Sequence, residues 1–218
     1  MARTRSDLTA ALETAGVVGI IRMKEAFRLR DVTAALVDAG LRALEVTMTT
    51  PGAVDLIKAM APTLPADFLL GAGTVIDAET VARVVDAGAT FVVSPVFRPA
   101  IIEACHRHDV PALPGCFSPT EILDAWEAGA DIVKVFPATA LGPGFIRDVR
   151  APLPQVKLMP TGGVTVDNAG DWIRAGAVAI GLGSALFDPK KLAANDFEAI
   201  AGLAKRALAN VAAAREAR

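Results

Sequence analysis

The chain has 218 residues, of which 53% are hydrophobic, enough for one domain with a sizeable core. Its formal net charge of −2 argues against a nucleic-acid-binding surface, which normally carries a basic excess. The longest uncharged run, residues 175–187, is broken by three glycines and is too short to span a bilayer. No apolar stretch of signal-peptide length lies near Arg3 and Arg5, so we expect no signal peptide, and Cys105 and Cys116 lack a CxxC spacing. We therefore expect a single domain over residues 1–218, located in the cytoplasm, with neither nucleic acid nor membrane as a partner.

Eight apolar runs are predicted to be strands, and amphipathic stretches separate them. The predicted strands are residues 17–23, 43–48, 68–75, 91–96, 111–116, 132–137, 156–161 and 179–183. The predicted helices include residues 25–38, 53–60, 79–86, 99–108, 120–127 and 167–174, with a short leading helix at 6–15 and a long closing helix at 190–217.

A recurring pattern at the helix ends supports this division. In four segments a charged residue and an alanine precede a glycine, and an apolar run follows. Glycine suits the left-handed C-cap of a helix that leads into a strand. The glycines are Gly40, Gly88, Gly129 and Gly176.

Eight strands that alternate with helices in this length are typical of an α/β protein of the (β/α)8 TIM-barrel type. An open, doubly wound sheet is the alternative, but no GxGxxG motif follows an early strand. In a barrel the active site lies at the carboxyl ends of the strands, so residues near those ends become the candidates for function.

Lys134 lies within the apolar run Ile132-Val133-Lys134-Val135-Phe136, which a proline ends. A lysine in a buried strand is costly to keep as an ammonium, which favours the free amine. A free amine can form a Schiff base with a carbonyl substrate. The alternative is a lysine that reaches solvent or pairs with a carboxylate.

Glu45 occupies the corresponding place on the second predicted strand, between Leu44 and Val46. Strand alternation puts Glu45 and Thr47 on one face, so the Glu45 carboxylate and the Lys134 amine can meet at the mouth of a barrel. A purely structural salt bridge between them is the alternative. Lys157 is a rival amine, but it comes earlier in its strand, nearer the opposite end of the barrel.

Glycine-rich turns follow the last two predicted strands, at Thr161-Gly162-Gly163 and at Gly181-Leu182-Gly183-Ser184. Barrels commonly hold a phosphate in these two loops, through backbone N–H groups and a hydroxyl. The same strings also occur as simple tight turns.

Arg22 ends the first apolar run and is either a solvated strand-end residue or a clamp for a carboxylate or phosphate. The two histidines, His106 and His108, are two positions apart on a predicted helix and point in different directions. No HExxH motif is present. We therefore predict no metal site.

Eight motifs in order resemble the bacterial 2-keto-3-deoxy-6-phosphogluconate (KDPG) aldolases, also known as 4-hydroxy-2-oxoglutarate (KHG) aldolases. The resemblance runs from Gly19 to Phe187. The motifs are Ile20-Ile21-Arg22, Glu45-Val46-Thr47, Gly71-Ala72-Gly73-Thr74-Val75, Ser94-Pro95, Pro114-Gly115, Lys134-Val135-Phe136-Pro137-Ala138, Pro160-Thr161-Gly162-Gly163 and Gly183-Ser184-Ala185-Leu186.

The resemblance implies a class I aldolase of the Entner–Doudoroff type that cleaves KDPG reversibly to pyruvate and glyceraldehyde 3-phosphate, and that can also act on 4-hydroxy-2-oxoglutarate. It implies that Lys134 forms the Schiff base and that Glu45 is the general acid and base. It implies that Thr74 and Thr161 line the site of the pyruvyl end of the substrate, with Pro95 and Phe136 as its walls. It also implies a phosphate subsite formed by Gly162, Gly163, Gly183 and Ser184. It also implies a homotrimer that needs neither metal nor cofactor.

One departure from the family pattern concerns the substrate carboxylate. Many members carry an arginine shortly after the Glu-Val-Thr segment, where this chain reads Met48-Thr49-Thr50-Pro51. A subset has an arginine at the end of the first strand instead, so we expect Arg22 to replace it. Three alternatives stay open: an aldolase for the galactonate epimer, a metal-free phosphosugar isomerase or epimerase, and a barrel without catalytic activity.

Overall fold

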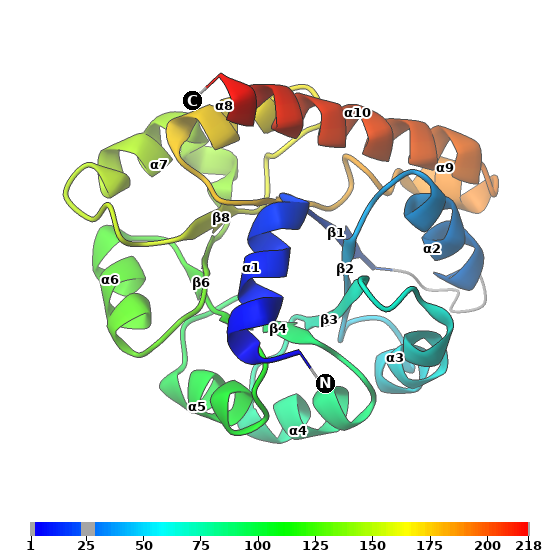
Figure 1. Ribbon diagram of the computed structural model, residues 1–218, viewed down its shortest axis with the longest axis horizontal. Coiled ribbons are helices and arrows are strands. Elements are labelled where there is room, and N and C mark those ends of the chain that lie inside the picture. The colour runs from blue at the N-terminus through cyan, green and yellow to red at the C-terminus, as the bar shows by residue number, and fades with distance from the viewer. Residues whose placement is uncertain (1–2, 23–28, 218) are drawn as a thin grey trace.

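The computed structural model describes residues 3–22 and 29–217, which form an α/β fold with parallel strands in a curled arrangement (Figure 1). Figure 1 shows the strands at the centre, helices α2 to α8 and α10 around them, and α1 across the middle. The strands are β1 (Val17–Ile21), β2 (Ala43–Thr47), β3 (Leu69–Gly73), β4 (Phe91–Val93), β5 (Ala112–Leu113), β6 (Gly115–Cys116), β7 (Val133–Val135), β8 (Leu158–Pro160) and β9 (Ile180–Leu182).

The helices alternate with the strands, as predicted. They are α1 (Arg5–Ala15), α2 (Leu29–Asp38), α3 (Ala53–Met60), α4 (Ala78–Asp86), α5 (Pro99–Arg107), α6 (Pro119–Glu127), α7 (Gly142–Arg150), α8 (Ala169–Ala175), α9 (Pro189–Ala193) and α10 (Phe197–Glu216), with short 3-10 turns at Ala61–Thr63 and Ala138–Ala140. Met23 and residues 25–28, which belong to the first predicted strand and the predicted helix 25–38, lie outside the described residues.

The strands form two parallel sheets, with the orders β5-β4-β3-β2-β1-β9 and β6-β7-β8. A single bridge between Thr161 and Gly181 joins the end of β8 to β9. The predicted strand 111–116 is interrupted at Pro114, which separates β5 from β6. Proline has no N–H for a strand ladder, although its carbonyl still accepts a hydrogen bond from the Lys134 N–H at 2.9 Å.

Two helix predictions need correction. The single closing helix predicted over 190–217 is divided into α9 and α10, because Asn195 adopts the left-handed region at φ 55° and Asp196 caps a new helix through the Ala199 N–H. The helix α7 was not among the predicted ones, since its start, Gly142-Pro143-Gly144, is poor in helix formers.

The four glycines predicted to end helices are confirmed. Gly40, Gly88, Gly129 and Gly176 all have positive φ, between 94° and 119°. Residues other than glycine rarely adopt this region of backbone conformation. Glycine at these positions therefore lets the chain turn from a helix toward the next strand.

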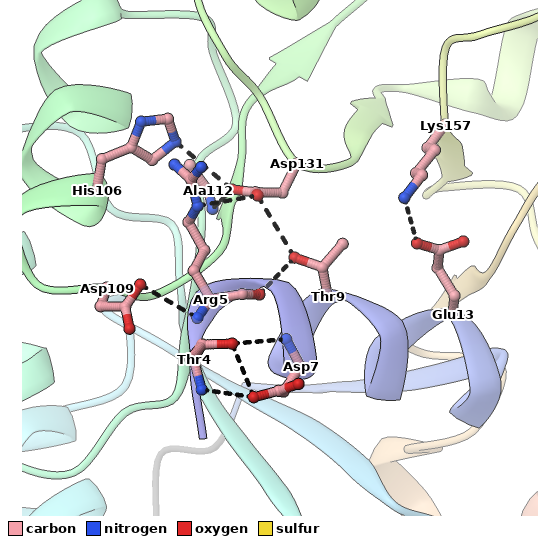
Figure 2. Close-up of polar contacts among 10 residues, drawn as sticks. All are labelled: Thr4, Arg5, Asp7, Thr9, Glu13, His106, Asp109, Ala112, Asp131 and Lys157. Carbon is pink, nitrogen blue, oxygen red and sulfur yellow. Dashed lines mark hydrogen bonds and ion pairs between the residues drawn. The ribbon is translucent and has the colours of Figure 1, made fainter. Parts of the chain in front are cut away.

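Helix α1 covers the amino ends of the strands, and its Thr4 cap forms reciprocal hydrogen bonds with Asp7 (Figure 2). Lys157, just before β8, pairs with Glu13 of α1 at 2.6 Å. Asp131, just before β7, accepts a hydrogen bond from the Ala112 N–H and contacts Arg5 and Thr9 of α1. These contacts leave the carboxyl ends of the strands as the open edge of the molecule.

The core fills both the space between the strands and the layer under the helices, with Leu44, Phe91 and Trp172 among its fully buried side chains. No helix in the described ranges 3–22 and 29–217 is long and apolar enough to cross a membrane.

Candidate active site

A cavity of about 420 Å3 opens at the carboxyl ends of the strands. It brings together every candidate site residue named from the sequence: Arg22, Glu45, Thr74, Pro95, Lys134, Phe136, Thr161, Gly162, Gly163, Gly183 and Ser184. These residues come from loops and strand ends that are far apart in the sequence, so their convergence depends on the parallel arrangement of the strands.

Lys134 lies in the middle of β7 and is 5% exposed. Strand alternation places Lys134 and Phe136 on the same face, and the Lys134 Nζ lies 4.8 Å from the centroid of the Phe136 ring. The strand is held on both sides, because Lys134 is in register with Gly115 of β6 and Met159 of β8. The largely buried Lys134 side chain therefore lines the cavity from a strand that is paired on both sides.

Glu45 lies in the middle of β2 and is 1% exposed. Its neighbour across the sheet is Gly71, and its carboxyl group lies against Gly73, where a Cβ atom would overlap the carboxyl oxygen. The glycine at position 73 thus makes room for the carboxyl group inside the sheet.

The electrostatic surroundings of Glu45 set its protonation. Burial raises the pKa of Glu45 above its usual range, and the positive charges of Lys134 and Arg22 oppose this shift only in part. Within the described part of the chain, Glu45 Oε2 has no hydrogen-bond partner. A carboxyl group near an amine, with a raised pKa and a free oxygen, is suited to proton transfer.

Thr74 follows β3 and has φ 60°, in the left-handed region. A β-branched residue seldom adopts this conformation, which costs of order 1–3 kcal/mol and is concentrated at functional sites. The unusual backbone turns the Thr74 residue to the cavity wall, while Val75 stays buried in the core.

The loop after β8 has two consecutive left-handed glycines, Gly162 at φ 87° and Gly163 at φ 71°. A Cβ atom on Gly163 would come within 2.7 Å of the Thr139 Cα, so the loop packs closely on the 3-10 turn after β7. Before this loop, Thr161 Oγ1 is buried at the cavity and lacks a hydrogen-bond partner among the described residues.

The loop after β9 turns at Gly183, whose carbonyl accepts hydrogen bonds from the N–H groups of Leu186 and Phe187. Ser184 is exposed at the cavity. In the described structure no hydrogen bond from the N–H groups of Gly163, Val164, Ser184 or Ala185 to another residue is present. Such free donors on two adjacent loops are suited to an anion.

Arg22 directly follows β1 and lines the same cavity. Its Nε donates a hydrogen bond to Thr49 Oγ1 at 3.0 Å, which draws the side chain toward the end of β2. Thr49 belongs to the segment Met48-Thr49-Thr50-Pro51 that follows the Glu-Val-Thr motif, so this contact brings Arg22 to that segment.

The rival amine Lys157 lies at the other end of the strands. Its ion pair with Glu13 of α1 is far from the cavity lining. Lys157 is not among the residues that line the cavity.

The sequence reasoning left some of the lining unassigned. Strand alternation placed Thr47 on the same face as Glu45, but no role in the site was assigned to it. The others carry no chemical signal of their own; they are Ile20, Val164, Ala185, Phe187 and Pro189. Of the described residues, no group of three or more His, Cys, Asp and Glu side chains could hold a metal ion.

Comparison with known proteins agrees with this geometry. The family model for KDPG and KHG aldolase matches residues 8–203. The 2-dehydro-3-deoxy-phosphogluconate aldolase of Treponema pallidum is 36% identical over 91% of this chain and 94% of that protein. A probable 2-dehydro-3-deoxy-6-phosphogalactonate aldolase of Rhizobium meliloti is 36% identical over 79% of this chain and 82% of that protein.

A solved structure gives the same result. The KDPG aldolase of Legionella pneumophila, with pyruvate captured as a covalent carbinolamine, superposes with a TM-score of 0.83 at 30% identity and covers 90% of this chain and 96% of that one. Family model, relatives and structure agree over most of the length, and this chain therefore belongs to the KDPG and KHG aldolase family and is a lyase.

Proposed function

We propose that this chain is a Schiff-base (class I) aldolase that cleaves KDPG reversibly to pyruvate and glyceraldehyde 3-phosphate, and that it also cleaves 4-hydroxy-2-oxoglutarate to pyruvate and glyoxylate. The observation that carries the proposal is the buried amine of Lys134 in one cavity with the buried carboxyl group of Glu45. The carbinolamine held by the Legionella pneumophila relative supports the same chemistry here.

In the proposed reaction, the Lys134 amine attacks the C2 ketone to form a carbinolamine, which loses water to give a protonated imine. Glu45 then takes the proton of the C4 hydroxyl, and the C3–C4 bond breaks. The electron pair of that bond moves into the protonated imine, which becomes an enamine. Glyceraldehyde 3-phosphate leaves, C3 of the enamine is protonated, and hydrolysis releases pyruvate and the free amine.

Substrate binding is assigned to the rest of the cavity. Arg22 binds the carboxylate next to the ketone. Its side chain is hydrogen-bonded to Thr49 near the end of β2, and its positive charge acts to lower the pKa of Glu45, so both observations place the cation near the reacting groups. Thr74, Pro95, Phe136 and Thr161 surround the pyruvyl part. The substrate phosphate binds at Gly162, Gly163, Gly183 and Ser184. The N–H groups on these two loops that lack a partner among the described residues, those of Gly163, Val164, Ser184 and Ala185, support an anion site. Binding energy from this remote group helps to orient the reacting bond.

The reaction as proposed needs neither metal nor cofactor, because the protonated imine is the electron sink. We also propose that residues 1–218 form one domain, a closed (β/α)8 barrel. Two features support closure: β5 and β6, which belong to different sheets, are separated only by Pro114 in the chain, and a bridge joins Thr161 to Gly181. The homotrimer and the cytoplasmic location stay predictions.

The galactonate epimer is a second candidate substrate, favoured by the 36% identity to the Rhizobium meliloti protein. The two substrates share the pyruvyl part and the phosphate and differ in configuration at C4. Comparison of kcat/KM for the two pure epimers decides between them.

Borohydride trapping tests the Schiff base directly. Incubation with pyruvate and borohydride is expected to add one reduced pyruvyl group to the protein, located by peptide mapping at Lys134. Lys134→Ala is expected to abolish the adduct. Lys157→Arg is the matched control, since it retains a cation beside Glu13 and is expected to trap normally. An adduct on Lys157, or trapping by Lys134→Ala, would contradict the assignment.

A further inference from the structure

A short hydrogen-bonded chain of side chains connects Arg22 to the sheet. The Arg22 Nε donates to Thr49 Oγ1 at 3.0 Å, and Thr49 Oγ1 lies 2.9 Å from Thr47 Oγ1. Thr47 is the last residue of β2 and is 1% exposed, whereas Arg22 and Thr49 are exposed. An exposed, charged side chain is thus connected through the Thr49 hydroxyl to the buried Thr47 at the end of β2.

The hydrogen bond at Nε has a geometric consequence for the guanidinium group. The group is planar, with five N–H donors in a fixed fork. The hydrogen bond to Thr49 restricts the direction of the Nε–H bond, and among the described residues the two Nη groups have no partner, so they remain for a ligand. Two parallel N–H groups in one plane match the two oxygens of a carboxylate.

Thr49 itself has a hydroxyl that can accept from Arg22 and donate to Thr47 at the same time. A valine of the same shape can do neither, and a serine can do both. Substitutions of Thr49 by valine and by serine therefore distinguish the effect of the hydroxyl group from the effect of side-chain volume.

We propose that Thr49 is a positioning residue, which holds Arg22 in the orientation that binds the carboxylate of the substrate. The inference rests on the proposed function of Arg22 as the clamp for that carboxylate. Thr49 acts through Arg22 and does not touch the reacting atoms. It orders the arginine before the substrate arrives, so that less conformational freedom is lost on binding.

The test compares Thr49→Val with Thr49→Ser. Thr49→Val is expected to raise the half-saturating pyruvate concentration in borohydride trapping, and KM for both KDPG and 4-hydroxy-2-oxoglutarate, by about three- to tenfold, as for loss of order in one long side chain. The value of kcat is expected to change much less. Thr49→Ser is expected to return KM close to that of the unaltered protein. Thr14→Val, at an exposed hydroxyl on α1, is a matched control with no expected effect.

A double-mutant cycle gives the decisive result. In an Arg22→Ala background, Thr49→Val is expected to have no further effect, because its role passes through the arginine. An equal additional loss in that background, or unchanged half-saturation in Thr49→Val alone, would overturn the inference and leave the aldolase function intact. Failure of the unaltered protein to trap pyruvate at any concentration would instead remove the proposed function and the inference with it.

Discussion

Glu45 illustrates how one residue links stability to activity. Its carboxyl group is buried beside Gly73, and one oxygen has no partner within the described chain. Burial raises the pKa of Glu45, so the folded protein holds this proton at pH values where an unfolded chain has already released it. The ionised form needed for catalysis is therefore the less stable form of the fold.

Replacement of Glu45 by Gln is expected to lower kcat by roughly 10²–10⁴-fold, the usual contribution of a positioned general base. The acid limb of the pH–rate profile is expected to lie above the usual range of a glutamate and to be absent in Glu45→Gln, because the raised pKa belongs to Glu45. Steady-state rates across the pH range measure both effects. A kcat of Glu45→Gln close to that of the unaltered protein would show that Glu45 has a structural role and not a catalytic one.

The same substitution is expected to change stability with a defined sign. A raised carboxyl pKa means that the folded state binds more protons, so its stability falls as pH rises from the usual glutamate pKa through the raised one. Glu45→Gln is expected to be more stable than the unaltered protein at neutral pH, with the difference shrinking toward acid pH. Urea unfolding at several pH values measures this, and a pH-independent difference would argue against it.

At the scale of elements, the loops that follow β8 and β9 line one side of the cavity. Gly162 and Gly163 require glycine for conformational reasons, since both have positive φ. Gly183 has an ordinary φ, and a Cβ atom there would meet no atom within 4 Å. The fold therefore does not require glycine at position 183. In the proposed phosphate subsite, the lack of a side chain at this position lets the phosphate approach the backbone closely.

Ser184→Ala is expected to weaken the transition-state binding of KDPG by about 1–3 kcal/mol, as for loss of a hydrogen bond to a charged group. The reaction of 4-hydroxy-2-oxoglutarate, which has no phosphate, is expected to be spared. Arg22→Ala is the comparison, because it removes a contact common to both substrates and is expected to impair both. Measurement of kcat/KM with each substrate distinguishes the two patterns; equal losses in Ser184→Ala would place the phosphate elsewhere.

At the scale of the whole molecule, the two ends of the strands have different tasks. The carboxyl ends carry the cavity, whereas the amino ends are covered by α1 and its polar contacts (Figure 2). Asp131 is central to those contacts, with the Ala112 N–H at 2.9 Å and Arg5 Nε at 3.4 Å. This division is typical of parallel barrels, in which one end supports stability and the other carries function.

Asp131→Ala is expected to destabilise the protein by roughly 1–3 kcal/mol, because it removes the acceptor of a largely buried N–H and the anchor of α1. Its kcat and KM at a temperature where it is folded are expected to match those of the unaltered protein. Chemical denaturation and steady-state kinetics on the same sample measure the two effects. A fall in kcat as large as that in Glu45→Gln would show that the two ends are coupled.

The sequence alone determined most of the elements and the two residues proposed for the chemistry. Apolar runs and left-handed glycines such as Gly40 are local signals, so they located the strands and the helix ends. A charged residue inside an apolar strand is also a local signal, because its burial is costly wherever the strand lies, and this identified Lys134 and Glu45.

The tertiary structure decided how these residues meet. The approach of the Glu45 carboxyl group to Gly73 depends on the register between β2 and β3, and the contact from Arg22 to Thr49 depends on two loops 27 residues apart in the chain. Local residue patterns carry no information on the distance between segments, which only the packing of the parallel strands around one core supplies.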